Sequence, residues 1–403
     1  ARAPSTALVV KPSAQPVSAP TFKAATWDAQ VDELVTSLLP TPASEKAVER
    51  LARRAEQLIR GIVPEAEVVG FASGAISRGR AFGVAVPDVD IVVSCGPMAL
   101  ASRLFGGRPL RAGNGQRMEG RQLQKAALRA FTDRLVSSGD FKFRRSAFGA
   151  EEPKVTLLAA SGVNGGDGSD AVPLDLAINS ATPLHNAALL TECAGFDRRA
   201  RALVLLVRRW ARDRGICHVA KGHLSPYCWT LLAIYFLQAA DDEQMLPPLD
   251  HFKASARLAG EKPKSNAEAT AASSAKSMTT KKSVGALFRA FVAFYGGGFD
   301  VRGEAASVRL GRRAPLNLKL PVHVALHEDG AGSEVAPSIE DPFDPTRNLA
   351  AGMSADGIVR FREELARASA LLAEDAPLAR LLEPWVPEGP STPSSTGSGK
   401  DSE

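Results

Sequence analysis

Two aspartates stand one residue apart at the start of an apolar run. Asp88 and Asp90 flank Val89, and the run continues to Val93. Because side chains alternate along a strand, both aspartates would point to the same side of a sheet. Two carboxylates held that close repel each other unless a cation lies between them, and hard oxygen ligands suit Mg²⁺. A DxD pair is also common in loops, so it needs support from other residues.

A third acid interrupts another apolar run. Asp175 lies within Pro173–Ile178, where a buried and unpaired charge would be costly. A shared metal ion would remove that cost. Three carboxylates on adjacent strands suit two-metal phosphoryl transfer, in which one ion activates an attacking 3′ hydroxyl and the other holds a triphosphate. The three acids therefore predict two Mg²⁺ ions, or Mn²⁺, at Asp88, Asp90 and Asp175.

A small, turn-forming stretch precedes the aspartates. Ala72-Ser73-Gly74-Ala75 follows the expected strand Glu67–Phe71. Leading into a helix, it could present backbone N–H groups and a hydroxyl to a triphosphate. An ordinary strand-to-helix turn has the same composition, so both interpretations stay open.

The elements that would position these residues form a mixed α/β unit followed by a helical one. Alternation and apolar runs predict strands at Glu67–Phe71, Val89–Val93, Lys154–Ala159 and Leu174–Ile178, and a helix from about Arg121 to Val136. Before them, helical spacing predicts a helix around Val31–Leu38 and a second one that begins with Ser44 as its N-cap and ends at Gly61. After Leu189 the pattern is helical, with strongly apolar segments at Leu203–Trp210 and Trp229–Leu237 and further helices at Val284–Tyr295 and Ile358–Leu372.

These patterns predict an α+β, bilobed fold: a small mixed-sheet domain and a mostly helical domain. The expected divisions are a tail at 1–26, helices at 27–60 that pack on the second domain, a first domain at 61–192 with an insertion at about 96–119, a second domain at 193–386 with a disordered loop at about 259–282, and a disordered tail at 387–403.

Composition narrows the possible partners. The formal net charge of +5 suits a polyanion, and no apolar stretch approaches the roughly 20 residues that a membrane-spanning helix needs. The four cysteines show no disulfide framework, which favours a reducing compartment. Cys217, His218, His223 and Cys228 are ligand types for zinc, but they lack a CxxC or HxxxH spacing, so a loop with incidental ligand types is favoured.

The N-terminal stretch lacks acidic residues before Asp28 and is rich in Ala, Ser, Pro and Thr. That composition is typical of an organelle transit segment or of a disordered tail. We therefore expect a mitochondrial location, with a cytoplasmic one as the alternative.

Taken together, the segments resemble the noncanonical poly(A) polymerases and terminal uridylyltransferases of the DNA polymerase β superfamily. They occur in the family's order from about Glu67 to Leu372. The supporting segments are Phe71–Ser73, Asp88–Asp90, Asp175–Asn179 with His185-Asn186, Val204–Arg212, Leu224–Tyr227, Val284–Phe288 and Ile339–Asp344.

The resemblance implies roles for single residues. Asp88, Asp90 and Asp175 match the metal-binding carboxylates, with Asp175 nearest the primer hydroxyl. The nucleotide-binding positions that match are Ser73, Ser225, Arg208 and Arg212 for the phosphates, Asn186 for the ribose 2′-hydroxyl, Tyr227 for stacking on the base, and Asp341, Asp344 and Arg347 for its Watson–Crick edge. The implied partners are UTP, a single-stranded RNA 3′ end and an RNA-processing or editing complex.

The chain also departs from the family pattern. Ala72 replaces the glycine before the serine, and the longer stretch up to Asp88 leaves Ser77 as an alternative phosphate contact. Ser225-Pro226-Tyr227 lacks one hydroxyl, and Ala187 replaces a threonine. Arginines stand where the family carries triphosphate-binding lysines, which keeps the charge but alters the donor geometry.

Base choice depends on donors and acceptors. Arg347 can donate to uracil O4 but would face a like donor at adenine N6, and Asp341 or Asp344 can accept from uracil N3–H. We therefore expect an RNA uridylyltransferase, with a poly(A) polymerase using ATP as the close alternative. The insertion and the transit-like N-terminus are most similar to mitochondrial uridylyltransferases associated with RNA editing in kinetoplastids. A catalytically silent RNA-binding scaffold, and an enzyme that transfers nucleotides to a small molecule or a protein, are the competing hypotheses from different functional classes.

Overall fold

A computed structural model describes residues 18–72, 74–76, 80–81, 84–106, 120–149, 152–160, 171–240, 244–249, 281–313, 315 and 320–386, with only the backbone of 80–81 and 84–85. Ser73 and Ser77, the two alternative phosphate contacts, lie outside the described residues. So do most of the loop at about 259–282, most of the expected N-terminal tail and the C-terminal tail.

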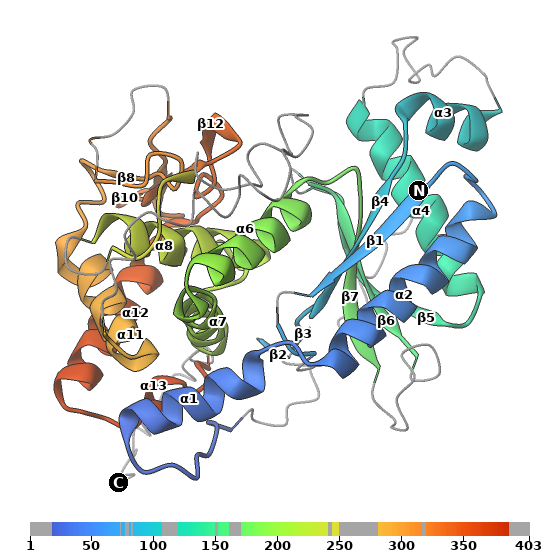
Figure 1. The fold of residues 1–403 in the computed structure, drawn as a ribbon. Helices are drawn as coiled ribbons and strands as arrows, with labels where there is room; N and C mark the ends of the chain where they lie inside the picture. The colour runs from blue at the N-terminus through green and yellow to red at the C-terminus, as the bar shows by residue number, and fades with distance from the viewer. Residues whose placement is uncertain are drawn as a thin grey trace, which may run out of the picture.

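A five-stranded mixed sheet forms the first half of the molecule (Figure 1). β4 and β7 are parallel, and the other neighbours are antiparallel. In spatial order the strands are β1 (Glu67–Ala72), β4 (Val89–Ser94), β7 (Val172–Ile178), β6 (Lys154–Ala159) and β5 (Phe141–Ala147). This architecture confirms the predicted α+β fold with a mixed sheet. Sequence analysis missed the edge strand β5, because its middle residues are largely exposed and form no apolar run.

Helices cover one face of this sheet: α2 (Pro42–Arg60) and α4 (Gly120–Ser137), with α3 (Pro97–Phe105) beside α4 (Figure 1). Leu51, Ile59 and Phe131 are fully buried between helices and sheet. The prediction that Ser44 is the N-cap of α2 is wrong, because the helix begins one turn earlier. Thr41 is the cap, and Ser44 completes a capping box with it at the third helical position.

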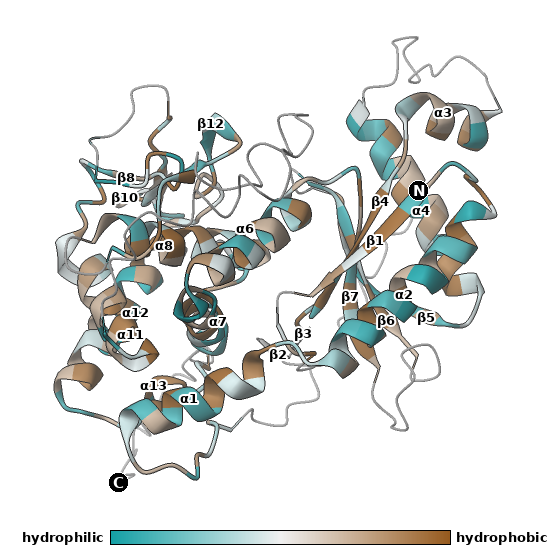
Figure 2. Ribbon diagram, viewed as in Figure 1, coloured by the Kyte–Doolittle hydropathy of each residue, from teal (hydrophilic) through white to brown (hydrophobic). Residues whose placement is uncertain are grey.

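The second half is built around α8 (Pro226–Ala239), of which every residue except Pro226 is buried. A helix that is apolar on all sides needs to be surrounded, and in Figure 2 it lies among brown segments of its neighbours. Trp210 and Trp229 pack edge to face across the α7–α8 contact with ring centroids 5.6 Å apart. The surrounding helices are α6 (Thr182–Phe196), α7 (Arg198–Asp213), η1 (Val219–Lys221), α11 (Val284–Ala293), η3 (Phe294–Gly298), α12 (Ala355–Ala373) and α13 (Leu378–Leu381).

Short strands complete the second half, and none of them was predicted from the sequence because they are too short to show alternation. They pair in one three-stranded and one two-stranded sheet, and a further ribbon precedes β4. The strands are β8 (Ala305–Ala306), β11 (Ser338–Asp341) and β12 (Asp344–Asn348); β9 (Val324–Leu326) and β10 (Ser333–Val335); and β2 (Arg80–Ala81) with β3 (Val84–Ala85).

The two N-terminal helices serve different halves. α1 (Trp27–Leu38) buries Val31, Leu34 and Val35 in the helical core. We expected α2 to pack there too, but this is wrong, because its apolar face lies against β1 and α4. Its stripe of apolar residues matches the sheet surface rather than the helical core.

The chain after β1 is fixed against the end of α1. The Ala75 N–H donates to the Leu38 carbonyl over 2.9 Å. A Cβ atom on Gly74 would lie 2.6 Å from that carbonyl oxygen, so only glycine allows this approach. The described residues between β1 and β4 include no helix, which corrects the expected strand-to-helix turn.

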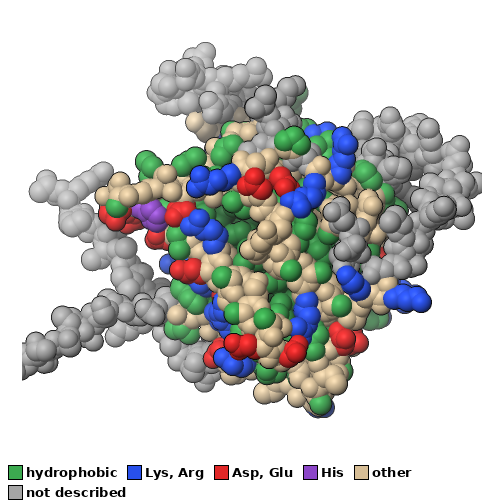
Figure 3. Space-filling model, turned by 90° about the vertical axis from the view of Figure 1, so that its left-hand side faces the viewer, with side chains coloured by type: hydrophobic (Ala, Val, Ile, Leu, Met, Phe, Trp, Pro, Cys, Tyr) green, Lys and Arg blue, Asp and Glu red, His purple; other side chains and the backbone are tan. Residues whose placement is uncertain are grey.

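No helix in the described ranges is both long and apolar enough to cross a membrane. The face of the molecule in Figure 3 carries Lys and Arg side chains interspersed with Asp and Glu. A polyanion would therefore find no single-sign surface on that face.

Candidate active site

Asp90 and Asp175 lie opposite each other on the parallel strands β4 and β7. Thr156 of β6 is opposite Asp175 on the other side, so all three side chains share one face of the sheet. Asp175 is buried, and its Oδ1 accepts a hydrogen bond from Thr156 Oγ1 over 2.6 Å. Lys154 Nζ lies 2.5 Å from its Oδ2. The strands thus bring together two of the predicted acids, and they add Thr156 and Lys154, which sequence analysis missed.

The negative charge of Asp90 and Asp175 is only partly offset by the neighbouring cations. Burial, and then the charge of Asp175, raise the pKa of Asp90 to about 6, although Lys154 and Arg208 act in the opposite direction. The charge of Asp175, in turn, is the main reason why the pKa of Lys154 is raised. Two neighbouring carboxylates, one of which opposes the ionisation of the other, offer oxygen ligands that suit a hard divalent cation.

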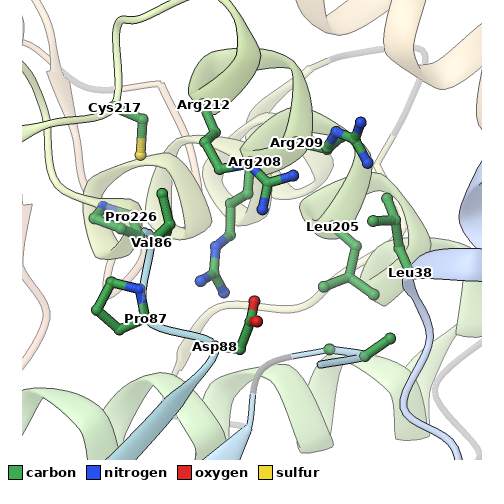
Figure 4. A pocket seen from close by; sticks show the side chains of 12 residues that line it. Leu38, Val86, Pro87, Asp88, Leu205, Arg208, Arg209, Arg212, Cys217 and Pro226 are labelled. Carbon is green, nitrogen blue, oxygen red and sulfur yellow. The ribbon is translucent and has the colours of Figure 1, made fainter. Parts of the chain in front are cut away.

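Asp88 is placed differently from the other two acids. It precedes the first residue of β4, where its N–H donates to the Pro173 carbonyl over 3.1 Å. Figure 4 shows its carboxylate and the Arg208 guanidinium pointing toward each other. Within the described residues no group of three or more His, Cys, Asp and Glu side chains is arranged to hold a metal ion. The three-carboxylate metal site at Asp88, Asp90 and Asp175 therefore stays a prediction.

Arginines of α7 line a pocket next to Asp88 (Figure 4). Arg208 and Arg212, predicted to share a helix face, both contribute, and so does Arg209, which was not predicted. Asp213 orients two of them, accepting from Arg209 Nε over 2.6 Å and from Arg212 Nε over 3.4 Å. Arg208 Nη1 is buried without a hydrogen-bond partner in the described structure, and burial lowers its pKa. A buried donor aimed at a cationic pocket is suited to a phosphate oxygen.

The N-terminus of α8 also reaches this pocket through Pro226. Ser225 caps the helix, with its Oγ accepting from the Cys228 N–H over 3.1 Å. The hydroxyl predicted to contact phosphate is thus engaged in the cap. The helix end still adds partial positive charge beside the arginines, which strengthens the preference for an anion.

Tyr227, the second residue of α8, belongs to a second group of predicted site residues. The side chain is buried, and its hydroxyl has no hydrogen-bond partner among the described residues. Burial, and then the charge of Asp341, raise its pKa. On α6, the Asn186 Oδ1 accepts from Thr230 Oγ1 over 3.1 Å, and the His185 ring contacts the tilted Phe343 ring with centroids 3.6 Å apart. The predicted ribose and base residues therefore lie on the facing helices α6 and α8.

The β11–β12 hairpin contributes the remaining predicted residues, but not all three point the same way. Arg347 Nη1 donates to Asp341 Oδ2 over 3.1 Å, and Asp341 is buried. Asp344 is exposed and accepts from the Thr346 hydroxyl over 2.7 Å, a bond that lowers its pKa. Asp341 and Arg347 thus form an ion pair, and Asp344, which lies opposite Asp341 across the hairpin, bonds to Thr346 instead.

Glu152, which sequence analysis missed, lies between the two parts. Its carboxylate accepts hydrogen bonds from Ser180 and Thr182, and Arg347 Nη1 lies 3.8 Å from its Oε1. Burial is the main cause of the raised pKa of both Asp90 and Tyr227, and the charge of Glu152 adds to both. It is therefore close to the carboxylate pair and to the tyrosine. No periodic pattern surrounds this residue in the sequence, so only the fold could reveal it.

Cations gather beside Asp175 on the other side. Arg145 Nε on β5 donates to Thr156 Oγ1 over 3.2 Å. Burial, and then the charges of Arg145, Lys221 and Lys154, lower the pKa of His218. Positive groups of β5, β6 and η1 thus surround the approach to the carboxylate pair.

A scan against models of known protein families finds no match for this chain. Among curated proteins it is 30% identical over 188 residues to the Speckle targeted PIP5K1A-regulated poly(A) polymerase of Ailuropoda melanoleuca, which is 45% of this chain and 20% of that protein. It is 26% identical over 206 residues to Terminal uridylyltransferase cid1 of Schizosaccharomyces pombe, 49% of this chain and 50% of that protein. The chain thus spans about a fifth to a half of the length of these relatives.

Solved structures agree over a longer range. The Cid1 poly(U) polymerase has a TM-score of 0.61 at 20% identity, covering 89% of this chain and 98% of that one. An mtPAP mutant with bound ATPγS has a TM-score of 0.64 at 18% identity, covering 90% and 74%. These likenesses show the fold. By sequence, the chain is thus similar over about half of its length to noncanonical poly(A) polymerases and a terminal uridylyltransferase, and it shares the fold of the Cid1 poly(U) polymerase.

Proposed function

We propose that this protein is a template-independent nucleotidyltransferase that transfers UMP from UTP to an RNA 3′ hydroxyl. The observation that carries the proposal is the opposition of Asp90 and Asp175 across β4 and β7, next to the arginine-lined pocket. The pair fits a cation, and the pocket fits a polyphosphate. Relatives named as poly(A) polymerases and uridylyltransferases support this class of reaction.

Asp90 and Asp175, with Asp88 at the start of the same strand, would hold Mg²⁺. A related Cid1 poly(U) polymerase structure contains Mg and 3′-dATP. Such an ion supplies Lewis-acid stabilisation of the phosphate and lowers the pKa of an attacking hydroxyl. Arg208 and the N-terminus of α8 bind and orient the triphosphate. Thr156 and Lys154 hold the Asp175 carboxylate in place.

The base would lie between Tyr227 and the Asp341–Arg347 unit. A guanidinium donates to uracil O4, and a carboxylate accepts from uracil N3–H. Adenine would place its N6 donor against the same guanidinium, so the unit favours UTP. Asp341 is the supported partner, since Asp344 is exposed and bonded to Thr346. ATP use is the close alternative, because several relatives are named poly(A) polymerases.

The RNA would approach from the side of β5 and η1. Arg145, Lys154 and Lys221 place positive charge on the side of Asp175 where the 3′ end would lie. Backbone phosphates of a single strand would be attracted there. The proposal includes a mitochondrial location and an RNA-processing or editing complex as partner, on the composition of the N-terminal segment and the family resemblance.

The test is extension of a labelled single-stranded RNA with Mg²⁺ and each ribonucleoside triphosphate separately. Extension with UTP alone would support the whole proposal. Extension mainly with ATP would keep the reaction and overturn the base assignment. No extension with any nucleotide, under Mg²⁺ or Mn²⁺, would contradict the proposed activity of the isolated chain and favour a scaffold.

A further inference from the structure

Glu152 is the acid that joins the two parts of the site. It stands two residues before β6, on the sheet side, and its side chain is 32% exposed. An acid beside a triphosphate site repels the substrate, so we expect its charge to be offset by a cation or by hydrogen-bond donors. Both are present, and they come from two different elements.

The first contacts hold the connection between β7 and α6. Ser180 and Thr182 donate their hydroxyls to the two oxygens of Glu152, the latter over 2.5 Å. Ser180 is buried, and Thr182 is the first residue of α6, whose N-cap Ala181 offers no side-chain cap. The carboxylate therefore stabilises a helix N-terminus that its own sequence leaves uncapped. That connection leads from Asp175 to His185 and Asn186.

The second contact reaches the base-reading hairpin. Arg347 Nη1 is shared between Asp341 Oδ2 at 3.1 Å and Glu152 Oε1 at 3.8 Å. Only the shorter distance is a hydrogen bond, and the longer one is an electrostatic contact. The Arg347 side chain is 25% exposed, so solvent screens this attraction only in part. Two carboxylates thus fix the guanidinium from opposite elements, one on β11 and one on the sheet side.

We propose that Glu152 is a positioning residue that sets nucleotide selectivity by holding Arg347 against the β7–α6 connection. The inference rests on the proposed function, since it takes Arg347 as the residue that reads the base. With Glu152 neutral, Arg347 follows Asp341 alone and its donors move relative to the catalytic strand. The triphosphate contacts of Arg208 do not depend on Glu152, so loss of selectivity does not require loss of nucleotide binding.

The experiment measures kcat/KM for UTP and for ATP on the full chain carrying Glu152→Gln. The amide still offers an oxygen to one of the two hydroxyls but removes the charge that attracts Arg347. The ratio of the two kcat/KM values is expected to move toward unity by about 3–10-fold, the size of one partly screened charge contact. Glu65→Gln is the matched control, because that acid pairs with Arg103 on the exterior of the sheet unit and should leave the ratio unchanged.

A double-mutant cycle with Arg347→Ala separates positioning from general damage. If Glu152 acts through Arg347, the Glu152→Gln change in the ratio disappears when Arg347 is already absent. Additive effects, or an unchanged ratio in Glu152→Gln, would overturn the inference. Should Glu152→Gln unfold, Glu152→Asp keeps the charge but is one methylene shorter, and an intact ratio with that variant would equally count against it. A wild-type chain that extends no RNA would instead defeat the proposed function itself.

Discussion

The proposed phosphate-binding end and the proposed base-reading end of the site are built in different ways. Asp90 and Asp175 occupy regular positions on two hydrogen-bonded strands, so their separation follows from strand register alone. Arg347, Asp341, Tyr227 and Glu152 come from a hairpin, a helix and a loop that are far apart in the sequence. The first end is held in place by the buried core of the sheet. The second is held by a few side-chain contacts, so small changes there should alter selectivity before they alter chemistry.

Removing a carboxylate of the pair should have the largest effect. Asp175→Asn keeps the shape but removes the charge that a metal ion and Lys154 require, so kcat should fall by on the order of 10³-fold. Nucleotide binding, measured separately by fluorescence of a labelled UTP, should change far less. If kcat of Asp175→Asn is comparable to that of the wild type, the pair is not the catalytic centre. Asp133→Asn, on α4 and away from the pair, is the control.

Arg208→Ala tests the phosphate side of the comparison. Loss of a buried, charge-assisted donor should raise KM for every nucleotide by about 10–100-fold, without changing the preference among bases. Steady-state kinetics with UTP and ATP provide both quantities. Arg198→Ala, an exposed residue on the same helix, should leave KM unchanged. If Arg208→Ala changes the preference for UTP over ATP, phosphate binding and base selection are not separate functions of the two ends.

Arg347→Ala tests the base side. The UTP to ATP ratio of kcat/KM should fall by about 10-fold, because one donor to uracil O4 is lost and the clash with adenine N6 is relieved. The measurement is the same pair of kinetic assays. An unchanged ratio would rule out the assignment of Arg347 to the base, whatever the effect on overall rate.

The smallest expected effect is a pH-dependent change in the thermal stability of the metal-free protein. Folding raises the pKa of Asp90 from an ordinary value of 3.8 to about 6, so between these values the folded state binds more protons than the unfolded state. This group therefore destabilises the fold at neutral pH, and the penalty declines as pH falls below about 6 and is lost near 3.8. In EDTA, Asp90→Asn should melt a few degrees higher than wild type at neutral pH, with the difference shrinking toward pH 5. A constant difference would contradict the charge pairing described for the site.

The same contrast explains what could be predicted from the sequence. The four apolar strands and the long helices follow from periodicity, and Asp90 and Asp175 interrupt apolar runs, so they were recognisable. β5 was missed because an edge strand exposes most of its side chains, and α2 was placed in the wrong half because amphipathicity does not say which core it faces. Glu152, Lys154 and Thr156 act through pairings across the fold, and no local pattern marks them.

The most direct test of the central claim is RNA extension with the two diastereomers of UTP that carry sulfur on the α-phosphate, in Mg²⁺ and in Mn²⁺. If the carboxylate pair holds an ion against the transferred phosphate, one diastereomer should react much more slowly in Mg²⁺ and recover in Mn²⁺, which accepts sulfur more readily. If both diastereomers react in Mg²⁺ at the rate of unmodified UTP, the result would contradict a metal ion at Asp90 and Asp175.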